Sequence, residues 1–147
     1  MAAAAKKVSG ATLWIGTTAE NGASDSYTQI GNVKTITMAG GGSFQMVDVT
    51  TISDTVKQTE KTVLDPFDCD VDIQEDPADA GQAAFKAAFE NTTAGANFNF
   101  ELRFSQGDKV RWKAKVTQHT KPVGSVGNVR MIKGKIEAQT VETYVAA

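Results

Sequence analysis

Apolar and polar residues alternate most regularly between residues 67 and 118, and the first strand predicted there covers residues 67–73. Every second position in that stretch is an aspartate, namely Asp68, Asp70 and Asp72, and the positions between them are apolar. A period of two is typical of a strand that buries one face and exposes the other. The apolar positions include Cys69, which we expect to be a buried structural thiol.

A hairpin is predicted farther along, from residues 97–104 and 109–116, across the short turn SQGD. In each strand the apolar residues point to one side, and the opposite side is polar or charged. The polar positions are Asn97, Asn99, Glu101, Arg103, Lys109, Arg111, Lys113 and Lys115. We therefore expect an antiparallel sheet with a single buried face, whose basic side is solvated or ion-paired.

A helix is predicted between these strands, in the segment DAGQAAFKAAFEN. Asp76 precedes Pro77, which suits the first helical position, and Asp79 follows as in a capping box. Asn91 and the TTAG after it end the helix. The side chains expected to share one inward stripe are Ala78, Gln82, Phe85, Ala88 and Phe89.

Weaker strand patterns flank this unit. Residues 12–16 predict a short strand, with Trp14 in the core or at an interface, and residues 30–38 predict a strand with an irregular start or bulge. Near the end of the chain, Ile132, Gly134, Ile136 and Ala138 alternate with Lys133, Lys135 and Glu137, which predicts a last strand. The fold class predicted is mainly β with one α-helix, as two antiparallel sheets or one strongly curled sheet in a single domain.

Residues 39–62 do not fit this core. Three glycines at the start, Gly40, Gly41 and Gly42, favour a hinge, and a Thr-rich polar half follows. The segment is too long for an ordinary loop and has too few large apolar residues to form its own core. We interpret it as an inter-subunit arm, mobile before assembly, that uses Gly40, Gly41, Gly42, Phe44, Met46, Val49, Ile52 and Val56.

Composition removes several classes of function. The formal charge of −2 argues against a general nucleic-acid binder, and neither a signal peptide nor a membrane span is predicted. The one histidine, His119, lies in a turn-like stretch without triad partners. The three aspartates lack the glycine and glutamate of a calcium loop, and AGGGS lacks the Lys-Ser/Thr of a phosphate loop. We expect no enzyme activity, no metal and no cofactor.

The order of these elements resembles the tail tube (major tail) proteins of lambda-like bacteriophages with long, non-contractile tails. The resemblance rests on TLWIG, the Gly- and Thr-rich arm, the alternating strand, the Pro-opened helix and FNFELRFSQGDKVRWKAKVTQ, and it covers roughly residues 10–140. It implies a β-sandwich or barrel-like subunit and a structural role in the virion. Residues 1–9, outside the resemblance, are expected from their composition to be a flexible N-terminus. Another self-assembling tube protein, of the secretion-system type, and a β-sandwich binding module remain as alternatives.

The resemblance also implies partners. Such subunits form hexameric rings that stack into a tube through which double-stranded DNA passes, after assembly in the host cytoplasm. The tape measure, tail terminator and distal tail proteins are further partners that it implies. Because a basic lining would bind DNA, we expect Asp68, Asp70 and Asp72 to face the lumen. The alternative is that they are solvated outside or paired with lysines.

Overall fold

The structure, a computed structural model, describes residues 10–19, 21–39, 42–122, 127 and 129–147. The flexible N-terminus predicted at 1–9 and the hinge residues Gly40 and Gly41 lie outside the described residues. The elements in chain order are β1 (Thr12–Ile15), β2 (Thr28–Ile30), β3 (Val33–Ala39), β4 (Ser43–Asp48), β5 (Thr59–Asp65), β6 (Asp68–Gln74), α1 (Ala80–Glu90), β7 (Phe98–Arg103), β8 (Lys109–Thr120), β9 (Met131–Ala138) and β10 (Thr143–Val145).

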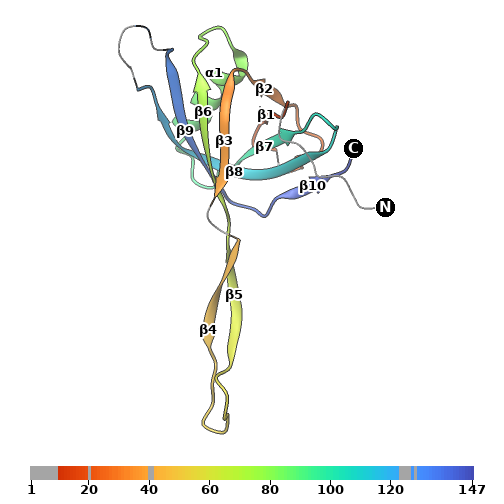
Figure 1. Cartoon of the computed structure of the whole chain (residues 1–147), viewed down its shortest axis with the longest axis vertical. Helices are drawn as coiled ribbons and strands as arrows, with labels where there is room; N and C mark the ends of the chain where they lie inside the picture. The colour runs from red at the N-terminus through yellow and green to blue at the C-terminus, as the bar shows by residue number, and fades with distance from the viewer. Residues whose placement is uncertain (1–9, 20, 40–41, 123–126, 128) are drawn as a thin grey trace.

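The body is one curled antiparallel sheet, with α1 at one end of it and the β4–β5 hairpin projecting from the other (Figure 1). Its strand order is β2-β1-β7-β8-β9-β6-β3, and β10 also pairs with β8. The long strand β8 joins the two halves. Its first half pairs with β7 and β10, its second half pairs with β9, and a register shift lies between Val116 and Gln118. The predicted mainly β fold with one helix is confirmed.

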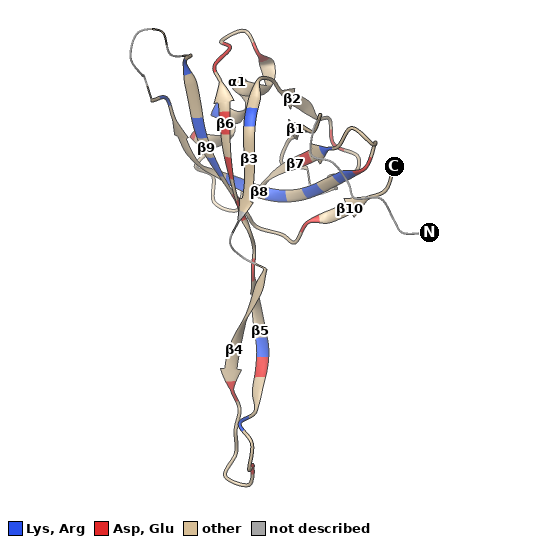
Figure 2. Ribbon diagram, viewed as in Figure 1, with Lys and Arg blue, Asp and Glu red and all other residues tan. Residues whose placement is uncertain are grey.

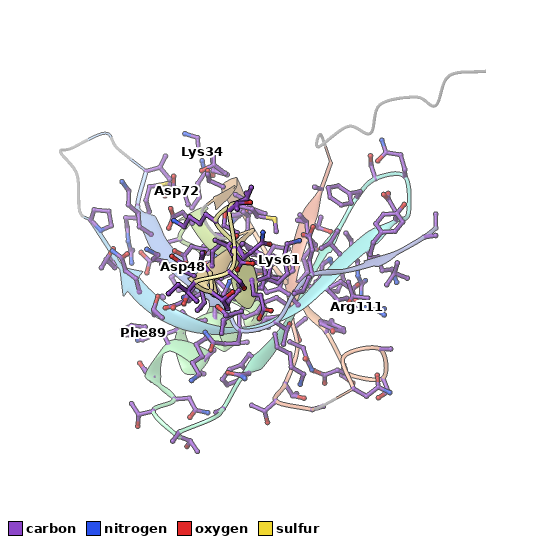
Figure 3. The ribbon with its side chains drawn as sticks, turned by 90° about the horizontal axis from the view of Figure 1, so that it is seen from below. Lys34, Asp48, Lys61, Asp72, Phe89 and Arg111 are labelled. Atoms are coloured by element: carbon purple, nitrogen blue, oxygen red, sulfur yellow. The ribbon has the colours of Figure 1, made fainter. Side chains whose placement is uncertain are left out.

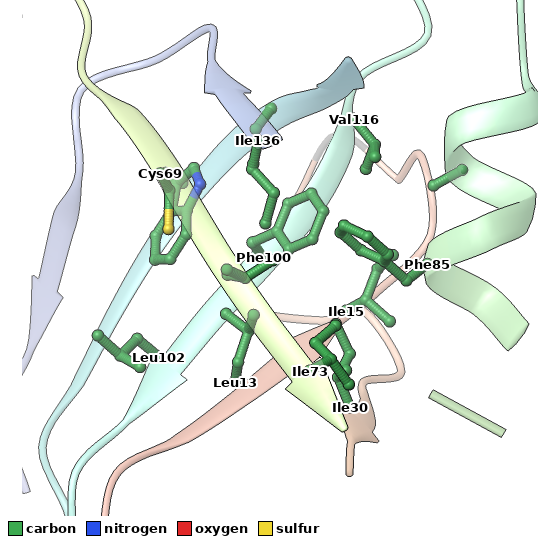
Figure 4. Close-up of a cluster of buried hydrophobic side chains, with 14 of the residues drawn as sticks. Leu13, Ile15, Ile30, Cys69, Ile73, Phe85, Phe100, Leu102, Val116 and Ile136 are labelled. Atoms are coloured by element: carbon green, nitrogen blue, oxygen red, sulfur yellow. The ribbon is translucent and has the colours of Figure 1, made fainter. Parts of the chain in front are cut away.

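The core fills the inside of this curl. Phe85 from α1 points toward Phe100 of β7 and Ile136 of β9 (Figure 4). Trp112 packs edge-on against Phe67. The inward positions of β6 and β9 are buried as the alternation predicted, and Cys69 is buried with them. The buried apolar side chains are Leu13, Ile15, Ile30, Cys69, Val71, Ile73, Phe85, Ala88, Phe100, Leu102, Trp112, Ala114, Val116, Ile132, Ile136 and Ala138.

The helix starts later than predicted. Asp79, and not Asp76, is the N-cap, because its carboxylate accepts from the backbone N–H of Gln82 and also from that of Gly31. The Asp76 carboxylate instead accepts from the N–H of Ala78 and forms the turn before the helix. Two residues of the predicted inward stripe are exposed. Ala78 lies before the start of the helix, and Phe89 is exposed because the buried face includes Gly81, Phe85 and Ala88 and is turned away from it.

Gly81 sets how closely α1 approaches the sheet. A Cβ atom at this position would lie 1.9 Å from the backbone oxygen of Gln29 on β2. Gly134 has the same role below Phe85, whose Cζ atom would lie 2.4 Å from an added Cβ. Because neither glycine has a side chain, the helix can pack directly against the β2–β1 edge at Gly81, and Phe85 can pack against β9 at Gly134.

One strand differs clearly from its prediction. β7 is buried on both faces, since Asn99 and Glu101 are as inaccessible as Phe100. The segment that follows β1 covers the second face, where Asn99 donates to the carbonyl of Ala19 and to the carboxylate of Asp25. The expectation of a single buried face fails here because alternation along a strand does not reveal a loop that folds back over it.

Two smaller predictions are confirmed with refinements. The irregular start of the strand at residues 30–38 is a turn, with Asn32 at a φ of 59°, followed by a register shift between Val33 and Thr35. The final stretch forms two strands, β9 and β10, which lie along the same side of β8. His119 is not in a turn; it belongs to β8, and its ring lies near those of Phe85 and Phe89.

Candidate assembly surfaces

The predicted arm is a β-hairpin that extends away from the body (Figure 1). Its pairing continues to Asp65, three residues beyond the predicted end at 62, and we use the name arm for residues 43–65 from here on. Gly42 precedes it with a φ of 72°, which glycine adopts most easily, and its N–H donates to the carbonyl of Asp65; its role as a hinge stays a prediction. The sequence suggested a loop here because the segment has few large apolar residues after Ile52 and so no alternation that marks a buried face.

The side chains of the arm have almost no cover from their own chain. The apolar members Phe44, Met46, Val49, Ile52 and Val56, which the sequence analysis assigned to the arm, are all exposed, and so are Val47 and Val63. Ile52 at the tip is fully exposed. Two-stranded hairpins alone are marginally stable in water, and a row of exposed apolar residues typically marks an interaction site.

Several strands of the body have an edge that no described strand pairs with; β2 and β10 each pair with one strand alone, and β3 and the second half of β8 also have such an edge. β3 pairs with β6 alone among the described strands. Residues 115–120 of β8 pair with β9 on one side, while β7 ends its pairing at Ala114 on the other. These edges bound one continuous segment of four strands, in the order β3-β6-β9-β8. Unpaired backbone groups along a strand are a template for another strand.

The outer face of this four-stranded segment is polar. It carries the three aspartates of β6, with β3 on one side and β9 on the other (Figure 2). Asp70 stands opposite Lys135 and Asp72 opposite Lys133, and the Lys135 ammonium lies 3.8 Å from a carboxylate oxygen of Asp68. The members of this polar face are Thr35, Thr37, Asp68, Asp70, Asp72, Lys133, Lys135 and Glu137, together with Lys115, Gln118 and Thr120 of β8.

One ion pair of the kind named in the alternative, between Lys135 and Asp68, is therefore present within one copy. Lys115 of β8 lies opposite Glu137, so the polar face has four carboxylates against three ammonium groups and keeps a small net negative charge. Exposed ion pairs of this kind add little stability, so their effect on the local potential is the more important one.

A second charged group lies at the other end of β8, and the sequence analysis missed it. The carboxylate of Glu101 is fully buried, and it accepts from the Nε atoms of Arg103 and Arg111, the latter at 2.7 Å. The Lys109 ammonium lies 4.0 Å away. We call these four residues the Glu101 cluster. Burial alone would raise the pKa of Glu101, but the hydrogen bonds from Arg111 and Arg103 outweigh it and hold the pKa below its ordinary value.

A signal for this cluster is visible in hindsight. Glu101 and Arg111 are directly opposite each other across the predicted hairpin, and Arg103 is opposite Lys109. Counting charges across the turn would have found one acid among three bases. Figure 3, viewed along the arm, places Arg111 on the side of the body away from Asp72.

The environments of Cys69 and His119 do not suit catalysis. Burial raises the pKa of the Cys69 thiol to about 12, so the thiolate nucleophile is not available at neutral pH. Burial lowers the pKa of His119, which packs against two phenylalanine rings. Among the residues that the structure describes, no three His, Cys, Asp or Glu side chains gather as a metal site. No described helix is long and apolar enough to cross a membrane.

Comparison with known proteins gives matches in structure only. No protein-family model matches the chain, and no curated protein matches it. One similar solved structure is the tail of an empty GTA particle with C6 symmetry, at 13% identity and a TM-score of 0.65, over 97% of this chain and 100% of that one. Another is the SPP1 tail tube, at 14% identity and a TM-score of 0.63, over 93% of this chain and 77% of that one.

Identities this low establish the fold and not the activity. The match nevertheless extends over nearly all of the chain, so it includes the curled sheet, the helix and the arm together. The resemblance predicted from the order of elements is confirmed at the level of architecture: this chain has the fold of the tail subunits found in the GTA particle and in the SPP1 tail tube.

Proposed function

We propose that this protein is the structural subunit of a phage-type tail tube, in which six copies form a ring and rings stack through the arm. The observation that carries the proposal is the pair of unpaired edges on the β3-β6-β9-β8 segment. The C6 symmetry of the similar GTA tail supports the number of copies.

The directions of the strands suit such a ring. All neighbours in the segment are antiparallel, so β3 and β8, three steps apart, run in opposite directions. The β3 edge of one copy can therefore receive the β8 edge of the next copy as another antiparallel pair. Because the two edges differ, the contact is heterologous, and repeating it with a constant rotation closes a ring.

In that ring the polar face is the lining. One side of the segment is occupied by the core, which leaves the side with the aspartates and lysines to face the central space. A lining with net negative charge lets a polyanion pass, whereas a row of unpaired lysines would hold it. The three aspartates thus have the role of keeping Lys133 and Lys135 from acting as phosphate sites.

The arm is the element available for the contact between rings. It projects from the end of the body, its apolar side chains lack a partner within the described chain, and a contact between unlike surfaces repeats without closing. This role requires no catalysis, metal or cofactor. Tape measure, terminator and distal tail proteins are the further partners of such a tube, in a virion tail assembled in the host cytoplasm.

Crosslinking tests the ring contact directly. A variant with Thr37→Cys in β3 and Gln118→Cys in β8 should, with a short bis-maleimide, give a ladder of covalent species that ends at six copies. Cys69 is buried and serves as an internal unreactive thiol. The matched controls are the two single variants, which should give no ladder. A protein that stays monomeric at high concentration in every salt condition, with no ladder, would contradict the proposed function.

A further inference from the structure

The Glu101 cluster contains more positive charge than its own chain neutralises. Three cationic side chains share one carboxylate, and their side chains are only a fifth to a third exposed. Both arginines use their Nε atoms for Glu101, while a guanidinium has five N–H donors. Half-buried cations with donors to spare are suited to an anionic partner.

The cluster is also held rigidly. The guanidinium carbon of Arg103 lies 3.8 Å from the centroid of the Trp14 ring, and Arg111 is fixed by its bond to the buried carboxylate. Lys113, one step along β8, donates to the carbonyl of Ala19 at 2.6 Å. Side chains already fixed in place lose little conformational entropy when a partner binds.

A recess opens beside this cluster. It has a volume of about 350 Å³, and its walls include Tyr27, Asn99, Arg111, Lys113 and Val141. The Val141 side chain is 61% exposed at its rim. The recess therefore offers an apolar contact next to two cations, on the β8–β10 side of the body and away from the polar face.

The tip of the arm has the complementary chemistry. Ile52 is fully exposed there, between Asp48 and Asp54. Over residues 43–65 the arm has four carboxylates, at Asp48, Asp54, Glu60 and Asp65, against the two ammonium groups of Lys57 and Lys61. An apolar residue flanked by carboxylates fits a recess with an apolar wall and flanking cations.

We infer that the arm tip of a second copy docks in this recess, with Ile52 against Val141 and with Asp48 and Asp54 facing Arg111 and Lys113. This inference rests on the proposed function and names the surface that receives the arm. Tip and recess lie on different parts of one chain, so the contact is heterologous and adds copies along the tube. It also makes assembly depend on ionic strength, because the charges involved lie near the surface.

A charge exchange tests the inference. Asp54→Lys alone and Lys113→Glu alone should each raise the protein concentration needed for tube growth about tenfold, and the double variant should recover most of that loss. Lys113→Glu leaves both guanidinium partners of Glu101 in place, so the body keeps its fold, which circular dichroism checks. Sedimentation and electron microscopy give the threshold concentration and the tube length.

A second pair of variants tests the apolar half. Ile52→Asp should prevent tube growth, whereas Val129→Asp, at an exposed valine outside the arm, should not. The docking inference is overturned if the double charge variant needs a threshold concentration raised as much as the two single effects combined. It is also overturned if Lys113→Glu assembles at the wild-type threshold. Wild-type protein that forms no tubes at all contradicts the proposed function instead, so the two failures are distinguishable.

Discussion

Gly81 shows how a single residue couples the helix to the sheet. Replacing a helical glycine by alanine normally stabilises a helix by about 1 kcal/mol. Here we predict the opposite sign for Gly81→Ala, because the added Cβ would meet the backbone of β2, which cannot rotate away. The expected loss is about 2–3 kcal/mol in the free energy of urea unfolding. Ala87→Gly, on the exposed side of α1, is the control and should cost only about 1 kcal/mol.

Glu101 makes the stability of the body depend on pH. Its folded pKa lies below the ordinary value of 4.5, so its stabilising effect is complete above that value and is lost as the pH falls through the folded pKa. Glu101→Gln should cost about 2 kcal/mol at pH 7, since two charge-assisted hydrogen bonds weaken. In urea titrations, the difference in free energy of unfolding between variant and wild type should become smaller below about pH 4.5. A difference that grows there would contradict this account.

At the scale of residues, the sequence predicted burial well where a strand has one neighbour layer. The alternation in β6 and β9 identified Cys69, Val71 and Ile136 as core residues. It failed for Glu101, because the loop that buries the second face of β7 is distant in sequence. It also failed for Phe89, since helical spacing alone does not show that Gly81 shifts the buried stripe.

At the scale of elements, the arm should be the least stable part of the free subunit. Its hairpin pairs only with itself, and its side chains are exposed, so its amides should exchange within seconds in the monomer. In assembled tubes they should be protected by at least about a hundredfold, because new contacts then oppose opening. Hydrogen exchange followed by mass spectrometry measures both states, with the β6–β9 pair as a protected reference.

Removing the arm separates folding from assembly. A variant in which a short Gly linker replaces residues 43–65 should keep the circular dichroism and urea midpoint of the body, since the buried core has no residue in the arm. Tubes should be absent. Tubes of normal length from this variant would show that the arm has no part in stacking.

The sequence predicted which elements exist better than how they pair. The β6 strand, the helix and the β7–β8 turn were all recognisable from local periodicity and turn residues. The free edges of β3 and β8 were not, because strand order depends on contacts far apart along the chain. The division between β9 and β10 was missed for the same reason, as both pair with β8.

At the scale of the whole molecule, the net charge of the polar face should control passage of DNA. Replacing Asp68, Asp70 and Asp72 by lysine in a tube would turn a negative lining into a strongly basic one in every copy. We expect such tubes to retain DNA in filter-binding assays at moderate salt, with release as salt rises, while wild-type tubes retain none. Equal retention by both would show that the polar face lies outside.

The central claim is that copies join edge to edge through β3 and β8, and electron microscopy of the assembled protein tests it most directly. The account predicts rings of six copies stacked into a hollow tube. Each ring should have a closed sheet built of β3, β6, β9 and β8 from every copy, with the three aspartates of β6 toward the lumen. A tube in which β3 of one copy has no strand of its neighbour beside it, or one with the aspartates outside, would contradict that claim.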